Sequence, residues 1–300
     1  MSQMAPNVPS SSTSVTKNEQ VIGPWKEAWH SFKKNKVALI GAVIVAFFIL
    51  LAIFGPIIAP QGINEQQLSN RLKAPSADHW FGTDDFGRDI FSRVVLGARI
   101  SLKVGFFSVI GSAAIGSVLG IIAGYYGRFV DTVISRMFDV LLAFPSILLA
   151  IAIVSILGPS LNNALIAIAI INVPNFGRLI RSKVLSIKQE EYITAAKAIG
   201  MRDFRILFSH ILPNSMTPVI VQGTLAIASA IIEAAALGFL GLGAEAPQPE
   251  WGKMLADARI YLVNAPWTMI FPGLAIMLTV LGFNLMGDGL RDALDPKMKS

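Results

Sequence analysis

Cysteine is absent from the 300-residue sequence. Its absence excludes disulfide bonds, iron–sulfur clusters and zinc sites with thiolate ligands. Charged residues are scarce as well: they make up 15% of the chain, compared with about 25% in soluble domains. Hydrophobic residues make up 53%, and the mean hydropathy is +0.60. Water cannot be the solvent for so much apolar surface, so the composition predicts an integral membrane protein.

The charged residues that remain have a basic excess, with a net charge of +6 at pH 7. In a soluble protein such an excess could indicate binding of nucleic acid. Here the basic residues lie beside apolar runs, which indicates contact with anionic lipid headgroups. We therefore expect membrane lipid, and no nucleic acid, among the partners.

Motifs for nucleotide hydrolysis and other enzyme chemistry are also missing. The single Gly-Lys pair, Gly252-Lys253, lacks the upstream glycine that a phosphate-binding loop requires. The chain has no H-E-x-x-H motif, no G-x-S-x-G motif and no dinucleotide-binding fingerprint. Its three histidines lie far apart in the sequence. We predict a protein that is not an enzyme and that binds no cofactor or metal itself.

Six apolar runs are long enough to cross a bilayer, which takes about 20 residues. The predicted spans are Val37–Ala59, Ala98–Gly124, Val130–Leu157, Asn163–Leu185, Ser215–Leu240 and Trp267–Met286. Pro145 and Pro174 interrupt the third and fourth runs, where we expect kinks that membrane helices tolerate. The pattern predicts an all-α integral membrane protein with six transmembrane helices.

Lysine and arginine residues concentrate on one side of the predicted spans. Cytoplasmic segments of membrane proteins carry the positive excess. We therefore predict a multi-pass inner membrane protein with both termini in the cytoplasm. We divide the chain into four parts. They are a cytoplasmic tail with an amphipathic surface segment (1–36, with 1–21 disordered), a first span with its external loop (37–97), a larger membrane domain (98–289) and a cytoplasmic tail (290–300).

The external segment Pro60–Gly97 carries interleaved charges of both signs. Its charged cluster consists of Asp84, Asp85, Arg88, Asp89 and Arg93. Because opposite charges alternate, they can neutralise one another locally. We expect either a salt-bridged loop that lies on the membrane or a docking surface for an external partner.

Ionisable residues inside predicted spans are candidates for function. Arg136 and Asp139 lie three residues apart in the third span, so they share a helix face and can form an ion pair. Glu233 has no basic partner in the fifth span; it either faces an aqueous cavity or pairs with another helix. If Asp139 and Glu233 formed a proton relay, the chain would be an ion-coupled secondary carrier.

Small residues recur in the second span, where Gly116, Gly120 and Gly124 stand at intervals of four. Such spacing lets two helices approach closely. We expect these glycines to pack against another helix of this chain; the alternative is packing against a second membrane subunit.

A long charged insert, Glu190–Asn214, separates two of the apolar runs. Its leading glutamates suit the start of a helix, and Gly200 suits a left-handed helix end. We predict a second helix through His210 that Pro213 ends before the fifth span. One face of that helix carries apolar side chains at helical spacing, namely Met201, Phe204, Phe208 and Ile211. This helix–glycine–helix loop suits a groove on a partner or the lipid interface.

The same insert resembles the EAA loop of ABC importer permeases, written E-A-A-x3-G-x9-I-x-L-P. The matching residues are Ala195, Ala196, Gly200, Leu212 and Pro213, with Thr194 in place of the usual Glu and His210 in place of the usual Ile. Further residues fit the variant of the dipeptide and oligopeptide branch, namely Tyr192, Ile193, Arg205, Ile206 and Asn214.

Longer motifs in the same order are similar to the C-type permease subunit of dipeptide, oligopeptide, nickel and glutathione importers. They are FGTDDFGRDIFSRVVLGARISL (Phe81–Leu102), RMFDVLLAFPSILLA (Arg136–Ala150), LGFLGLGAEAPQPEWGKML (Leu237–Leu255) and FNLMGDGLRDALDPKMK (Phe283–Lys299). The resemblance implies a type I ABC importer permease fold, with residues 98–289 as the permease domain.

The resemblance also implies a set of partners: a B-type permease, two cytoplasmic ABC ATPases that bind ATP and Mg²⁺, and an external solute-binding protein. The EAA loop would be the coupling helix, with Phe204 and Phe208 filling a groove on an ATPase. Short peptides are the expected solute, with glutathione and nickel as alternatives that the sequence does not separate.

Overall fold

The computed structural model describes residues 24–294, and over this range it contains helices and no β-strand. The α-helices are α1 (Pro24–Lys34), α2 (Lys36–Ile58), α3 (Ile90–Tyr126), α4 (Arg128–Leu142), α5 (Ser146–Leu157), α6 (Leu161–Ile187), α7 (Glu191–Ala198), α8 (Asp203–Ile206), α9 (Leu212–Phe239), α10 (Trp251–Ala258) and α11 (Trp267–Leu294). A short π-helix, Leu207–Ile211, joins α8 to α9. The predicted all-α class is confirmed.

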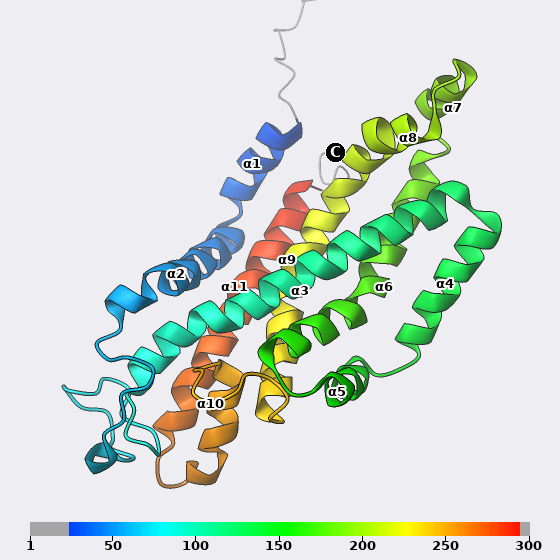
Figure 1. Ribbon diagram of the computed structural model, residues 1–300. Coiled ribbons are helices and arrows are strands. Elements are labelled where there is room, and N and C mark those ends of the chain that lie inside the picture. Colours follow the sequence, from blue (N-terminus) through cyan, green and yellow to red (C-terminus); the bar gives the residue numbers. More distant parts are fainter. Residues whose placement is uncertain (1–23, 295–300) are drawn as a thin grey trace, which may run out of the picture.

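The long helices α2, α3, α6, α9 and α11 run between two ends of the molecule (Figure 1). One end, called here the α7 end, holds α1, α7, α8 and the last turns of α11. The opposite end, called the α10 end, holds α10 and the loop between α2 and α3. The segments that the charge pattern assigns to one side of the membrane, α1, α7, α8 and the last turns of α11, thus lie at one end. Those assigned to the other side, the α2–α3 loop and α10, lie at the opposite end.

The most extensive helix packing is between α3 and α6, and glycines on α3 make it possible. A Cβ added at Gly116 would lie 2.6 Å from the Val173 carbonyl oxygen, and one at Gly120 would lie 2.4 Å from the Gly177 carbonyl oxygen. At Gly124 it would lie 2.9 Å from a side-chain carbon of α6. The glycine spacing therefore packs within this chain, as predicted, and brings two backbones into contact.

Five described helical segments are long and apolar enough to cross a membrane. They are Lys36–Ile58, Ile90–Tyr126, Leu161–Ile187, Asp203–Phe239 and Trp267–Leu294. Pro174 lies buried inside α6, which continues through it; the kink expected there stays a prediction. Packing of α6 against α3 supports the helix on both sides of the proline.

The predicted third span is broken rather than merely kinked. It forms α4 and α5, which are bent by 92° relative to each other and together could count as a sixth span. Pro145 occupies the N-cap position of α5, where its missing N–H costs no helical hydrogen bond. The residue before a proline is disfavoured in the α region, so the chain leaves α4 at Ala143.

The amphipathic segment near the N-terminus forms α1, as its pattern predicts. Ala28 and Phe32 are buried, and Phe32 packs in one cluster with Ala38 and with Ala293 of α11. The lysines Lys26, Lys33 and Lys34 are exposed. The predicted disordered tail, residues 1–21, lies outside the described residues, as does the last part of the predicted C-terminal tail.

The α3–α6 contact predicts a position-specific effect of adding a methyl group. Gly120→Ala places Cβ 2.4 Å from a backbone oxygen, so the helices must separate, and we expect a loss of about 1–3 kcal/mol in the free energy of unfolding. Gly111→Ala on the same helix is the control, because its Cβ makes an ordinary 3.5 Å contact with Ala169. Reversible unfolding in mixed detergent micelles measures both; equal stabilities would contradict the packing account.

Candidate functional site

The loop between α6 and α9 forms two helices joined at Gly200. Gly200 has φ +79°, the left-handed region in which glycine is favoured. Its N–H donates to the Lys197 carbonyl at 3.0 Å, and the Met201 N–H donates to the Ala196 carbonyl at 3.0 Å. This pair of hydrogen bonds is the Schellman arrangement that ends α7, so the predicted role of Gly200 in the backbone is confirmed.

The second helix does not end where Pro213 was predicted to end it. Helical structure runs from Asp203 through the π-helix into α9, and Pro213 lies in the first turn of α9. A proline ring in a helix clashes with the carbonyl four residues earlier. The wider π turn at Leu207–Ile211 accommodates the ring, so the predicted stop is wrong.

The predicted apolar face is divided between the surface and the core. Phe204 and Phe208 are 69% and 55% exposed, and their ring centroids lie 4.4 Å apart. Ile211 is fully buried, and Met201 packs against the core. Met201 precedes α8, so it is not part of this helix. Ile211 lies at the end of the π turn, which has more residues per turn than an α-helix, so it points away from the face of Phe204 and Phe208. We call Phe204 and Phe208 the exposed aromatic pair.

The loop is anchored to the end of α3 through Tyr125. The Tyr125 hydroxyl donates to Asp203 Oδ1 at 2.5 Å, and Lys188 Nζ donates to the Tyr125 carbonyl at 2.6 Å. The ammonium groups of Lys188 and Lys197 lie 5.7 and 5.4 Å from the centre of the Tyr125 ring, within cation–π range. Sequence reasoning did not find Tyr125, because its partners are distant in the chain.

The remaining EAA-loop residues have unlike environments. Ala196 of α7 is buried, whereas Thr194, Ala195, Arg205 and Pro213 are exposed. The rings of Tyr192 and His210 lie 6.0 Å apart. His210 and Leu212 are partly buried. The surface of the loop therefore combines the exposed aromatic pair with Tyr192, Ile199 and basic side chains.

The intramembrane ionisable residues do not form one relay. Asp139 pairs with Arg178 of α6 at 2.6 Å and with Arg136 at 3.6 Å, so the predicted pair exists but Arg178 is nearer. Glu233 accepts a hydrogen bond from Asn172 at 3.0 Å. Within residues 24–294, Glu233 has no ion pair.

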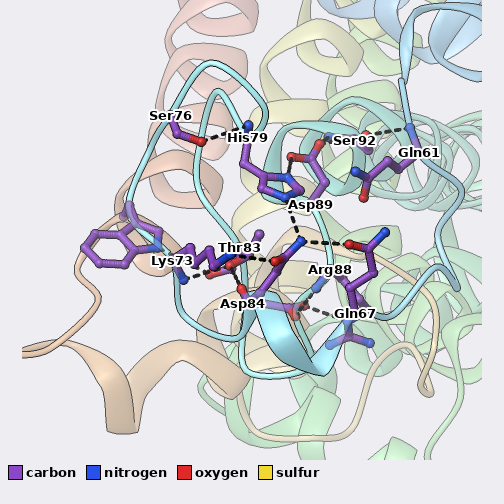
Figure 2. A network of polar contacts seen from close by, with 12 residues as sticks. Gln61, Gln67, Lys73, Ser76, His79, Thr83, Asp84, Arg88, Asp89 and Ser92 are labelled. Carbon is purple, nitrogen blue, oxygen red and sulfur yellow. Dashed lines mark hydrogen bonds and ion pairs between the residues drawn. The ribbon is translucent and has the colours of Figure 1, made fainter.

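At the α10 end, the loop between α2 and α3 is held by a network of polar contacts (Figure 2). Asp84 pairs with Arg88 at 2.6 Å and with Arg93 at 3.6 Å. Asp89 accepts from the Ser92 N–H at 2.8 Å, which caps α3, and contacts the His79 ring at 3.1 Å. The predicted local neutralisation of charge is therefore present. Docking of an external partner on this loop stays a prediction.

Two further acids at the α10 end, Asp85 and Glu250, have different surroundings. Burial and the neighbouring Asp84 raise the pKa of the Asp85 carboxyl, with Arg88 opposing them. On the adjoining segment, Glu250 is the N-cap of α10 and accepts from the N–H groups of Gly252 and Lys253. The indole of Trp251 donates to the Val94 carbonyl at 3.0 Å. The Trp251 indole therefore joins α10 to α3 at the α10 end.

The arrangement of these helices is similar to that in two solved structures of an ABC transporter. An inward-facing crystal structure of the MetNI methionine ABC transporter superposes with a TM-score of 0.54, over 69% of this chain and 98% of that chain, at 19% identity. A second structure of MetNI, from a crystal soaked with selenomethionine, gives 0.51 over 68% and 96%, at 18% identity.

Sequence comparisons identify the family. The profile described as binding-protein-dependent transport system inner membrane component matches residues 116–300, and that of the N-terminal TM domain of oligopeptide transport permease C matches residues 23–75. The chain belongs to the inner membrane components of binding-protein-dependent transport systems. It is a permease subunit of an ABC importer and is not itself catalytic; the ion-coupled carrier alternative is not supported.

Curated relatives agree with this assignment. The dipeptide transport system permease protein DppC of Alkalihalophilus pseudofirmus is 66% identical over 93% of this chain and 92% of its own length. The glutathione transport system permease protein GsiD of Escherichia coli O6:K15:H31 is 51% identical over 95% and 94%. The GsiD protein of Pectobacterium atrosepticum is 48% identical over 95% of each chain.

The anchoring role of Tyr125 predicts a local effect of removing one hydroxyl. Tyr125→Phe deletes the hydrogen bond to Asp203, and we expect local stability at residues 199–206 to fall by about 1 kcal/mol. Hydrogen exchange of that segment measures the effect. Tyr126→Phe is the control, because Tyr126 is exposed. Unchanged exchange in Tyr125→Phe would show that the loop is held by its buried side chains alone.

Proposed function

We propose that this chain forms half of the membrane pathway of an ATP-driven importer of short peptides and that the loop at residues 190–214 seats in a groove of an ATPase. The observation that carries the proposal is the exposed aromatic pair. Phe204 and Phe208, on α8 and the π-helix, are exposed together with Ile199, whereas Ile193, Ile206 and Ile211 of the same loop are buried. Exposed aromatic side chains on the surface of a structured loop favour a partner surface.

The proposed coupling works through a short mechanical path. Tyr125 ties the loop to the end of α3, and α3 packs along α6 through its glycines. A displacement of the loop by an ATPase is therefore passed directly to the two helices with the most extensive mutual contact. Alternating access would follow as the spans rock between inward-open and outward-open arrangements.

The remaining partners are proposed from the family and its relatives. A B-type permease would supply the other half of the pathway, two ABC ATPases would bind ATP and Mg²⁺, and an external binding protein would deliver the solute. The sequence has no phosphate-binding loop of its own, so the energy source lies on other chains. The named solutes of the relatives, dipeptide and glutathione, favour a short peptide here.

We further propose that the α7 end faces the cytoplasm and the α10 end faces outward. Basic residues at the α7 end support this orientation: they include Lys26, Lys33, Lys34, Arg128, Lys188, Lys197, Arg202 and Arg205. The same orientation presents the polar network of Figure 2 to the external binding protein.

The exposed aromatic pair predicts a selective loss of ATPase contact. Phe204→Asp places a charge where an apolar anchor is needed, and we expect ATPase affinity to fall by about 2 kcal/mol or more, roughly thirtyfold. Val263→Asp is the control, because Val263 is 91% exposed at the α10 end. Co-purification of the ATPases at matched expression, with uptake of a labelled dipeptide, measures both. Wild-type values for Phe204→Asp would mean that the loop lies on lipid.

The orientation is testable because the chain has no native cysteine. Single cysteines at two exposed positions, Lys197→Cys in α7 and Val263→Cys before α11, should react from opposite sides. In intact cells, an impermeant thiol reagent should label position 263 only; after permeabilisation it should also label position 197. Labelling of position 197 in sealed cells would reverse the proposed orientation.

A further inference from the structure

Polar side chains follow one side of α6 inside the membrane domain. Asn172, Asn175 and Arg178 stand three residues apart, a spacing that keeps them on neighbouring positions of one helix face. Asn172 is buried, while Asn175 and Arg178 are exposed. Helix α6 contacts α9 on one flank and α4 on another, and both neighbours contribute acidic residues to this face.

On the α9 flank, Asn172 holds the carboxylate of Glu233 in place. The Asn172 amide donates to the Ile168 carbonyl at 3.0 Å and to Glu233 Oε2 at 3.0 Å. Its oxygen lies 3.4 Å from the Asn175 amide nitrogen, which donates to it. Both amide hydrogens of Asn172 are used, so its orientation is determined. Glu233 Oε1 accepts no hydrogen bond from the described residues, and Glu233 is partly exposed.

On the α4 flank, the face continues through charged pairs. Arg178 contacts Asp139 at 2.6 Å, and Arg136 lies 3.6 Å from the same carboxylate. We call the whole set the polar ladder: Glu233, Asn172, Asn175, Arg178, Asp139 and Arg136. At a rise of about 1.5 Å per residue, Glu233 lies about 9 Å from the α10 end of α9, and Arg136 about 12 Å from the α7 end of α4.

The polar ladder cannot face lipid at low cost. An ionised side chain is costly inside a bilayer, and Arg136 and Asp139 have side chains that are 79% and 47% exposed. Helix α2 shows the contrasting case, since its exposed positions after Lys36 are apolar, with Val43 68% and Ile53 61% exposed. The face of the polar ladder therefore meets water or polypeptide, while α2 meets lipid.

We propose that the polar ladder lines this chain's half of the solute pathway and that Glu233 receives the cationic amino group of the passing solute; this inference rests on the function proposed above. A carboxylate with one free oxygen and an amide as its partner can accept from an ammonium, which has three donors. No lysine or arginine of the described chain competes for it. Because Asn172 already orients the carboxylate, the site is prearranged for a cation.

A neutral partner also suits transport. A pathway site must bind strongly enough to admit the solute and weakly enough to release it. Asn172 stabilises the position of Glu233 without neutralising its charge. Farther along, Asp139 is already paired with two arginines and is therefore less available to a second cation. Within the polar ladder, cation recognition is thus assigned to Glu233.

The test uses the assembled transporter, with cysteines of the partner chains replaced. Ser229 is exposed and lies one helical turn before Glu233, so Ser229→Cys reports on the surroundings of the carboxylate. We expect a cationic methanethiosulfonate to modify it about tenfold faster than an anionic one of similar size. Glu233→Gln should bring the two rates close to parity. Val43→Cys on α2 is the control and should remain unmodified.

Uptake provides a second readout. In the otherwise wild-type complex, Glu233→Gln should lower ATP-dependent uptake of a labelled dipeptide about tenfold or more, and Glu233→Asp should restore part of it. Affinity of the separate binding protein for the dipeptide cannot change, because that protein is unaltered. Full uptake by Glu233→Gln would overturn the role of Glu233.

The outcomes separate this inference from the function on which it rests. A wild-type complex without ATP-dependent uptake would overturn the proposed function and the inference together. Wild-type uptake with Ser229→Cys as unreactive as Val43→Cys would overturn only the pathway assignment. A third outcome combines two results: Ser229→Cys is unreactive, and the Glu233→Gln complex no longer retains the second permease. It would show that a basic side chain of that second permease pairs with Glu233, and it would also overturn the proposal.

Discussion

The close contact between α3 and α6 is the constraint on which the other features depend. Without side chains at Gly116 and Gly120, the two backbones approach so closely that an added Cβ would lie 2.4–2.6 Å from a carbonyl oxygen of α6. Helix α6 in turn contacts α4, α5 and α9. The position of α6 therefore determines where the polar ladder lies and where the chain enters the loop at α7.

The same contact links the membrane domain to the loop. Tyr125 lies at the end of α3 that follows the glycines and binds both sides of the loop, through Lys188 and Asp203. The loop is consequently joined to the ends of α3 and α6, with Ile193, Ile206 and Ile211 buried and the exposed aromatic pair on its surface.

Charged side chains are arranged differently at the two ends of the molecule and in the part between them. At the α10 end, aspartates and arginines neutralise one another inside a folded loop (Figure 2). At the α7 end, basic side chains surround the proposed ATPase contact. Between them, the polar ladder keeps one carboxylate, Glu233, free of ion pairs within the described chain. An unneutralised charge in a membrane is costly, so its retention favours a functional role.

Features that depend on residues close together in the chain were predicted from the sequence: the apolar spans, the helix end at Gly200, the glycine stripe of α3 and the motifs of the permease family. Tertiary packing decided the rest. Asp139 pairs with Arg178, Glu233 with Asn172 and Tyr125 with Asp203, and each partner lies on another element. The π turn at Leu207–Ile211 was not predicted, and the sequence predicted a kink at Pro145 but not a 92° break. Periodicity assumes one continuous α-helix, whereas packing against neighbouring helices selects where a helix widens, bends or stops.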